Sequence, residues 1–157
     1  MGHSPAEVAL AVKRLQHRHH RALSAALAPL GLSLVQWDTL RHLHRHPDAS
    51  LHDLAVLTFQ TDQSFGSLAQ RMADRGLIER VPGGPGGGRA VRHRITENGD
   101  LLRSKGQAAV EKVFAASFEH LGPQQLDRLG DLLDAALAPE PVCRGSSRSS
   151  AQSSGRK

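Results

Sequence analysis

One predicted helix near the middle of the chain carries side chains that suit hydrogen bonding to the edges of DNA bases. It begins at Thr61 or Asp62 and buries Phe65, Leu68 and Met72 at spacings of three and four residues. The candidate DNA-contacting residues of this helix are Thr61, Asp62, Gln63, Ser64, Ser67, Gln70 and Arg71. Glutamine and serine reach base edges, and glutamine matches the paired donor and acceptor of adenine. An ordinary solvated face explains the same residues equally well while the helix is considered alone.

Arginines surround the glycine-rich segment that follows this helix. Residues 78–81 and 91–95 are predicted strands, and residues 82–89 between them are too long and too rich in glycine for a tight hairpin turn. Arg89, at the end of this loop, is its predicted contact with DNA. Three more candidates for phosphate contacts, which do not depend on base sequence, are Arg80, Arg92 and Arg94. A solvated strand face remains the alternative for each of the three.

Local start and stop signals place these side chains in a helix, a turn, a second helix and a hairpin. Ser50 and Asp53 form a capping-box-like start for a short helix, and the helix with the polar face follows it. Gly76 can adopt the left-handed conformation that ends a helix. This order of elements is typical of a winged helix, in which the second helix lies in the major groove of double-stranded DNA.

Further helices are predicted before and after the winged-helix elements in the sequence. One runs from Pro5 to about Ala28, one follows the Ser33 capping box to His46, one runs from Glu97 toward His120, and a last one follows Gly122 and Pro123. The first and the last two carry apolar residues on more than one side, which a second copy of the chain would bury. A homodimer is therefore predicted.

The predicted fold class is mainly α with a small β-hairpin, a winged helix-turn-helix with N- and C-terminal dimerisation helices. Its predicted parts are an N-terminal dimerisation helix (1–32), the DNA-binding domain (33–96), C-terminal dimerisation helices (97–138) and a disordered Ser/Arg-rich tail (139–157).

Composition is compatible with a nucleic-acid partner. Twenty Lys and Arg against fifteen Asp and Glu give the 157 residues a formal net charge of +5 and a pI near 10.3. Four Phe, one Trp and no Tyr argue against a stacking platform for single strands. One cysteine excludes an intrachain disulfide and fits a cytoplasmic protein, and no apolar run is long enough for a membrane span.

Four strings of residues occur in an order and spacing that together are specific. They are residues 32–37 (LSLVQW), 51–55 (LHDLA), 68–80 (LAQRMADRGLIER) and 89–99 (RAVRHRITENG). With these strings, residues 6–137 resemble the bacterial multiple-antibiotic-resistance regulator (MarR) family. The resemblance implies a homodimer that binds palindromic operators, usually as a repressor of transcription. It also implies release from DNA when a small, often aromatic or anionic, compound binds.

In one respect the chain departs from the family pattern. The wing of the family usually carries Asp-x-Arg, and aligning its arginine with Arg89 places Gly87 at the aspartate, which implies a looser wing. By the same resemblance, an effector would bind between the dimerisation and DNA-binding parts, near His20, Trp37 and Arg41. For Trp37, packing in the core is the simpler interpretation.

Other chemistry is less well supported by the residues. His42 and His46 lie one turn apart, as do His17 and His20, but no nearby acidic residue or cysteine completes a ligand set, so neither a metal nor another cofactor is predicted. Cys143 has no resolving cysteine, which disfavours a redox switch. The chain lacks a phosphate loop, a nucleophile elbow and a zinc-hydrolase motif, so no enzyme activity is predicted.

Two alternatives stay open. One is a winged helix that contacts proteins, and the other is a metal- or redox-sensing regulator of the same fold. Residues 60–94 hold six arginines against three acidic residues, a net charge of +3, which favours a polyanionic partner over an ordinary protein surface.

Overall fold

A computed structural model describes residues 2–82 and 92–138 and confirms the predicted fold class, a set of helices with one antiparallel hairpin. The elements are α1 (Pro5–Leu27), a 3-10 turn η1 (Ala28–Leu30), α2 (Leu34–Arg45), α3 (Leu51–Leu57), α4 (Asp62–Asp74), β1 (Ile78–Val81), β2 (Arg92–Ile95), α5 (Glu97–Ser117) and α6 (Pro123–Leu137). The predictions for Arg89, the glycine-rich loop, Cys143 and the tail lie outside the described residues. Within those residues, no helix combines the length and the apolar character that a bilayer span requires.

Side-chain caps define where the helices begin, as predicted. The Ser33 N–H donates to Gln36 Oε1 (3.0 Å), and the Gln36 N–H donates to Ser33 Oγ (3.2 Å). Ser50 and Asp53 make the same reciprocal pair at 2.9 and 3.1 Å. The hydroxyl of Ser50, which donates to the Asp53 carboxylate (2.7 Å), and the Ser50 N–H together lower the pKa of that carboxyl. Because such caps satisfy N–H groups that have no partner inside a helix, α3 forms although it has only 7 residues.

The helix-turn-helix pair α3 and α4 is built around one apolar core. Leu54 and Ala55 of α3 meet Phe65 and Met72 of α4 in this core, and each of the four is at most 1% exposed. Gly76, with φ of +67°, ends α4 in the left-handed conformation that was predicted for it. The chain can therefore turn directly from α4 into β1.

The hairpin pairs Ile78 with Ile95 at its base and Val81 with Arg92 at its far end. The Thr96 hydroxyl donates to the carbonyl oxygen of Gly76 (2.6 Å), and the same hydroxyl oxygen accepts from the Gly99 N–H (3.0 Å). One side chain therefore joins the end of α4, the base of the hairpin and the first turn of α5.

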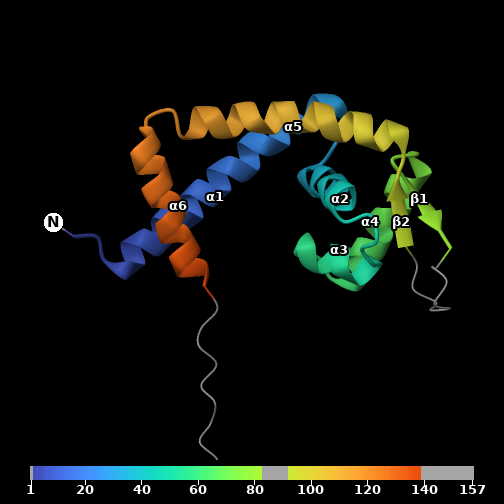
Figure 1. The fold of residues 1–157 in the computed structure, drawn as a ribbon, viewed down its shortest axis with the longest axis horizontal. Helices are drawn as coiled ribbons and strands as arrows, with labels where there is room; N and C mark the ends of the chain where they lie inside the picture. The colour runs from blue at the N-terminus through green and yellow to red at the C-terminus, as the bar shows by residue number, and fades with distance from the viewer. Residues whose placement is uncertain (1, 83–91, 139–157) are drawn as a thin grey trace, which may run out of the picture. The chain divides into compact units, whose positions relative to one another are not determined.

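Helix α5 packs against both α1 and α2, as Figure 1 shows. At its end the His19 ring of α1 lies edge-on to Phe114 and Phe118, and its Nε2 is 2.6 Å from Ser117 Oγ. At its start Arg103 donates to Asp100 (2.6 Å), which lowers the pKa of the Asp100 carboxyl. Since α5 begins at the hairpin, this one helix connects α1 to the DNA-binding domain predicted for residues 33–96.

Helix α6 belongs to a second compact unit of the chain. It begins after Gly122, whose N–H donates to Gln125 Oε1 (2.9 Å), with Pro123 in the first turn. None of its side chains is buried by the described residues, and Leu126, Leu132 and Leu137 are 44%, 60% and 79% exposed. An amphipathic helix with such an uncovered apolar surface needs a partner.

Helices α2 and α5 approach closely at Gly106. A Cβ on this residue would stand 2.8 Å from Trp37 Nε1 and 3.1 Å from Leu27 Cδ2, and Trp37 is itself only 6% exposed. The Trp37 indole N–H also donates to the carbonyl oxygen of Arg103 (3.3 Å). The absence of a side chain at Gly106 is what admits the indole.

We expect Gly106→Ala to destabilise the protein by roughly 1–3 kcal/mol, because the new methyl group must displace a packed indole ring. Gly66→Ala is the matched control, because nothing lies within 4 Å of a Cβ on Gly66 of α4. That substitution should instead stabilise by about 0.5–1 kcal/mol through helix propensity. Urea unfolding of both variants checks this, and equal effects at the two glycines would contradict it.

Candidate nucleic-acid interface and adjacent cavity

The residues on or just before α4 that were predicted to contact DNA are all exposed. The side chains of its inner face are buried, whereas seven residues on or just before the helix are exposed: Thr61, Asp62, Gln63, Ser64, Ser67, Gln70 and Arg71. The Thr61 hydroxyl oxygen accepts from the Ser64 N–H (3.2 Å) and caps the helix. Gly66, in the middle of this face, leaves room for a close approach of another molecule to the backbone.

The polar side chains of α4 differ in how far they are already engaged. Gln70 donates to Asp74 (2.8 Å), and Asp62 lies 2.9 Å from the His52 imidazole of α3. Gln63 and Arg71 make no side-chain hydrogen bond or ion pair with any residue that the structure describes. Gln63 and Arg71 therefore have their full hydrogen-bonding capacity available for a partner.

The arginines of the hairpin also differ in whether an acidic side chain already pairs with them. Arg94 donates to Glu79 on the neighbouring strand (2.8 Å), and Arg92 lies 3.9 Å from Asp48. Arg80 is exposed and has no acidic partner in the described part of the chain. Of the three predicted phosphate contacts in the described hairpin, Arg80 is the least compensated.

His93 lies on the inner face of the hairpin. It is 6% exposed, and its buried Nδ1 has no hydrogen-bond partner among the described residues. Burial lowers the pKa of His93, and the charge of Arg80, its partner across the strands, lowers it further. His93 is therefore a neutral core residue of the hairpin.

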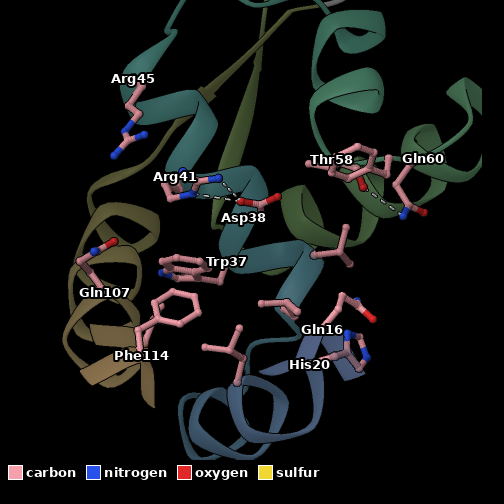
Figure 2. A pocket seen from close by; sticks show the side chains of 15 residues that line it. Gln16, His20, Trp37, Asp38, Arg41, Arg45, Thr58, Gln60, Gln107 and Phe114 are labelled. Carbon is pink, nitrogen blue, oxygen red and sulfur yellow. Dashed lines mark hydrogen bonds and ion pairs between the residues drawn. The ribbon is translucent and has the colours of Figure 1, made fainter. Parts of the chain in front are cut away.

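A cavity of about 580 Å³ lies between α1, α2, α5 and the turn that joins α3 to α4 (Figure 2). It contains all three residues that the resemblance placed near an effector, His20, Trp37 and Arg41. The complete lining is Gln16, His20, Leu23, Leu34, Val35, Trp37, Asp38, Arg41, Arg45, Thr58, Phe59, Gln60, Gln107, Val110 and Phe114. Trp37 is thus both a core residue, as expected, and a wall of the cavity.

The cations of this cavity are not equivalent. Arg41 donates to Asp38 (2.6 Å), and its guanidinium lies 5.7 Å from the centre of the Trp37 ring. Arg45, one turn further along α2, forms no ion pair with the described residues. Arg45 is therefore better placed than Arg41 to receive an anion. Sequence reasoning missed it, although Trp37, Arg41 and Arg45 follow one another at four-residue spacing on one helix face.

The turn between α3 and α4 borders both the cavity and the candidate DNA face. Gln60 donates from Nε2 to the carbonyl oxygen of Thr58 (3.3 Å), and its Oε1 accepts from the Ser64 hydroxyl on α4 (3.2 Å). Phe59 is 94% exposed and has φ of +56°, in the left-handed region. No pattern in the sequence marks these turn residues as part of a site.

The described residues contain no cluster of three or more His, Cys, Asp or Glu side chains in a position to hold a metal ion. His42 of α2 is instead partly buried, with Nε2 3.6 Å from Asp38 one turn earlier in the same helix. Burial lowers the pKa of His42, and the Asp38 carboxylate opposes that shift.

The sequence and fold of this chain are similar to those of known DNA-binding regulators. A sequence model of the MarR family matches residues 30–90. The HTH-type transcriptional repressor Rv2887 of Mycobacterium tuberculosis is 32% identical over 115 residues, which are 69% of this chain and 82% of the relative. This chain belongs to the MarR family.

Two solved structures of MarR family protein Rv2887 share the fold. Its complex with salicylic acid has a TM-score of 0.67 and 25% identity, and the match covers 86% of this chain and 97% of that one. Its complex with DNA has a TM-score of 0.70 and 24% identity, and the match covers 87% and 100%. The predicted MarR resemblance and winged-helix fold are confirmed, whereas the individual contact residues stay predictions.

We expect the buried His93 of this MarR-family hairpin to make stability depend on pH. The unfolded chain binds a proton at His93 near pH 6.5, whereas the folded protein binds it only at lower pH. The stability contributed by neutral His93 is therefore present above about pH 6.5 and lost as the pH falls below that value. Denaturant unfolding between neutral and mildly acidic pH should show a shallower loss for His93→Leu than for the wild type.

The matched control is His120→Leu, because the His120 side chain is 89% exposed. It should keep the pH dependence of the wild type. A His93→Leu protein that loses as much stability on acidification as the wild type would contradict this role for His93.

Proposed function

We propose that this MarR-family protein is a transcriptional repressor that binds a pseudo-palindromic operator in double-stranded DNA as a homodimer, and that a small aromatic anion releases it. The observation that carries the proposal is the shared turn between α3 and α4. This turn lines a ligand-sized cavity on one side and begins the polar face of α4 on the other. The relative Rv2887 is named a repressor and has been crystallised both with DNA and with salicylic acid.

In this proposal α4 lies in the major groove and the hairpin lies against the backbone of the DNA. Gln63 is the best candidate for reading a base, because its amide is exposed and unengaged among the described residues. Arg71 and Arg80 meet phosphates, and Arg89 would extend this contact from the wing. Arg92 and Arg94 first have to leave or share Asp48 and Glu79.

The homodimer is supported by apolar surface that each terminal helix leaves uncovered. On α1, Val8, Leu10 and Val12 are 46–53% exposed, and no residue of α6 is buried by the described chain. Water disfavours apolar surface of this extent, so burial against a second copy stabilises the pair. Two-fold symmetry then presents two copies of α4 to half-sites about 10 base pairs apart.

The cavity has the chemistry to accept an aromatic ring that bears a carboxylate. Trp37 and Phe114 supply aromatic walls from α2 and α5, and Val110 adds an aliphatic surface. Arg45, without an acidic partner in the described chain, would receive the carboxylate in a charge-assisted hydrogen bond. His20 lies across the same cavity on α1.

The proposed role is regulatory rather than enzymatic, and the proposed location is the cytoplasm.

We expect two substitutions at the DNA face to have different signatures on an operator selected by the protein from a random DNA pool. Gln63→Ala should change the preference at one base position, at a cost of about 1–3 kcal/mol. Arg80→Ala should weaken all sequences alike and reduce the dependence of log K on log salt by about one unit. Fluorescence anisotropy with operator variants and random DNA at several salt concentrations measures both effects.

If Gln63→Ala weakens operator and random DNA to the same extent, Gln63 does not read a base. If Arg80→Ala leaves the salt dependence unchanged, Arg80 does not contact a phosphate. Footprints of the wild type should show two symmetric half-sites.

We expect salicylate to bind in the cavity and to change the fluorescence of Trp37, which is the one tryptophan of the chain. Arg45→Gln should weaken this binding by about 1.5–3 kcal/mol, the usual contribution of a hydrogen bond to a charged group. Salicylamide, an uncharged analogue, is the matched control and should bind both proteins equally well. Equal affinity of salicylate for the wild type and Arg45→Gln would show that the carboxylate binds elsewhere.

A further inference from the structure

We infer that the side chain of Gln60 transmits occupation of the cavity to the DNA-contacting face of α4. The inference rests on the proposed function, and it adds the residue through which ligand and DNA binding are coupled. Among the cavity-lining side chains, only that of Gln60 makes a hydrogen bond to α4 within the described part of the chain.

The amide of Gln60 connects the end of α3 to the start of α4. Its Nε2 donates to the carbonyl oxygen of Thr58 at the end of α3 (3.3 Å), as the dashed line in Figure 2 shows. Its Oε1 accepts from the hydroxyl of Ser64 in the first turns of α4 (3.2 Å). Ser64 is one of the exposed residues proposed to reach DNA, so a single rotatable amide links cavity and interface.

The end of the link at α3 is fixed, whereas the end at α4 can be released. The Thr58 hydroxyl is buried and donates to the carbonyl oxygen of Leu54 (2.7 Å), and the Gln60 N–H donates to that of Ala55 (2.8 Å). These bonds hold the backbone of the turn. The Ser64 hydroxyl, in contrast, is exposed and can rotate to another acceptor without loss of a buried bond.

A carboxylate in the cavity would compete for the Gln60 amide. A hydrogen bond from Nε2 to an ionised acceptor is stronger than one to a neutral carbonyl. An amide that rotates toward such a ligand moves both of its polar ends, because its nitrogen and oxygen are fixed in one plane. Ser64 then loses its acceptor, and the start of α4 loses a contact that orients it.

Phe59 supplies a second reason for the turn to change shape when a ligand is present. Its ring lines the cavity yet is 94% exposed, and its left-handed backbone is one that residues with a Cβ rarely adopt. An aromatic ligand would bury part of this ring. Such a ligand would have a differential affinity for the arrangement in which Phe59 covers it, as a shift between two states requires.

The test compares the DNA dissociation constant with and without saturating salicylate. In the wild type, salicylate should weaken DNA binding by a factor within the usual range of about 5–150. In Gln60→Met, which keeps the length of the side chain but not its hydrogen bonds, this factor should fall below about two. Calorimetry should show that salicylate still binds Gln60→Met.

Gln107→Met is the matched control. Gln107 lines the same cavity from α5, but its amide donates to Glu111 (2.9 Å) and not to α4. This variant should keep the wild-type factor at saturating salicylate. Ser64→Ala removes the other end of the link and should also lower the factor, and adding Gln60→Met to it should have no further effect.

A Gln60→Met protein that binds salicylate and keeps the wild-type factor would overturn the inference while leaving the proposed function intact. Independent, additive effects of Gln60→Met and Ser64→Ala would overturn it as well. A wild-type protein that does not bind salicylate, or that binds it without any change in DNA affinity, would overturn the proposed ligand response and the inference together.

Discussion

The close approach of α5 to Trp37 at Gly106 is the constraint on which the arrangement of α1, α2 and the hairpin depends. Because Gly106 has no side chain, the indole packs against the backbone of α5 and donates to Arg103. The same helix begins at the base of the hairpin and ends beside His19 of α1. Trp37 therefore stabilises the core with one part of its surface and forms a wall of the cavity with another. A ligand there would contact a side chain that the rest of the fold holds in place.

The distribution of ion pairs separates structural cations from available ones. Arg41, Arg94 and Arg103 each hold a carboxylate within 2.8 Å, so a new anion has to compete with an existing partner. Arg45 and Arg80 hold none among the described residues, and they face the cavity and the hairpin surface respectively. Net charge attracts a polyanion from a distance, but these uncompensated groups decide where an anion binds.

The turn between α3 and α4 explains how one small domain can respond to two partners. The turn is short, and hydrogen bonds connect Thr58 to Gln60 and Gln60 to Ser64. A movement of Thr58 or Gln60 therefore changes the hydrogen bonding of Ser64, which lies in the first turn of α4. The hydrogen bonds from α3 keep the turn ordered without a ligand, whereas the exposed ring of Phe59 leaves apolar surface that a ligand can cover. Coupling in this protein thus needs only local changes in hydrogen bonds, without a long path through the core.

The sequence by itself was enough to predict the helices and the hairpin and to identify the family. Caps such as Ser33 with Gln36 are local, so the helix starts could be predicted and were found, and the spacing of Phe65, Leu68 and Met72 oriented α4 correctly. The strings around these elements were enough to identify the MarR family. Tertiary structure alone decided that Trp37 donates to Arg103, that His19 lies beside Ser117, and that α1, α2, α5 and the turn between α3 and α4 line one cavity. The physical reason is that caps, periodicity and pairs such as Arg41 with Asp38 act over a few residues, whereas the cavity exists only where helices that are distant in the sequence meet.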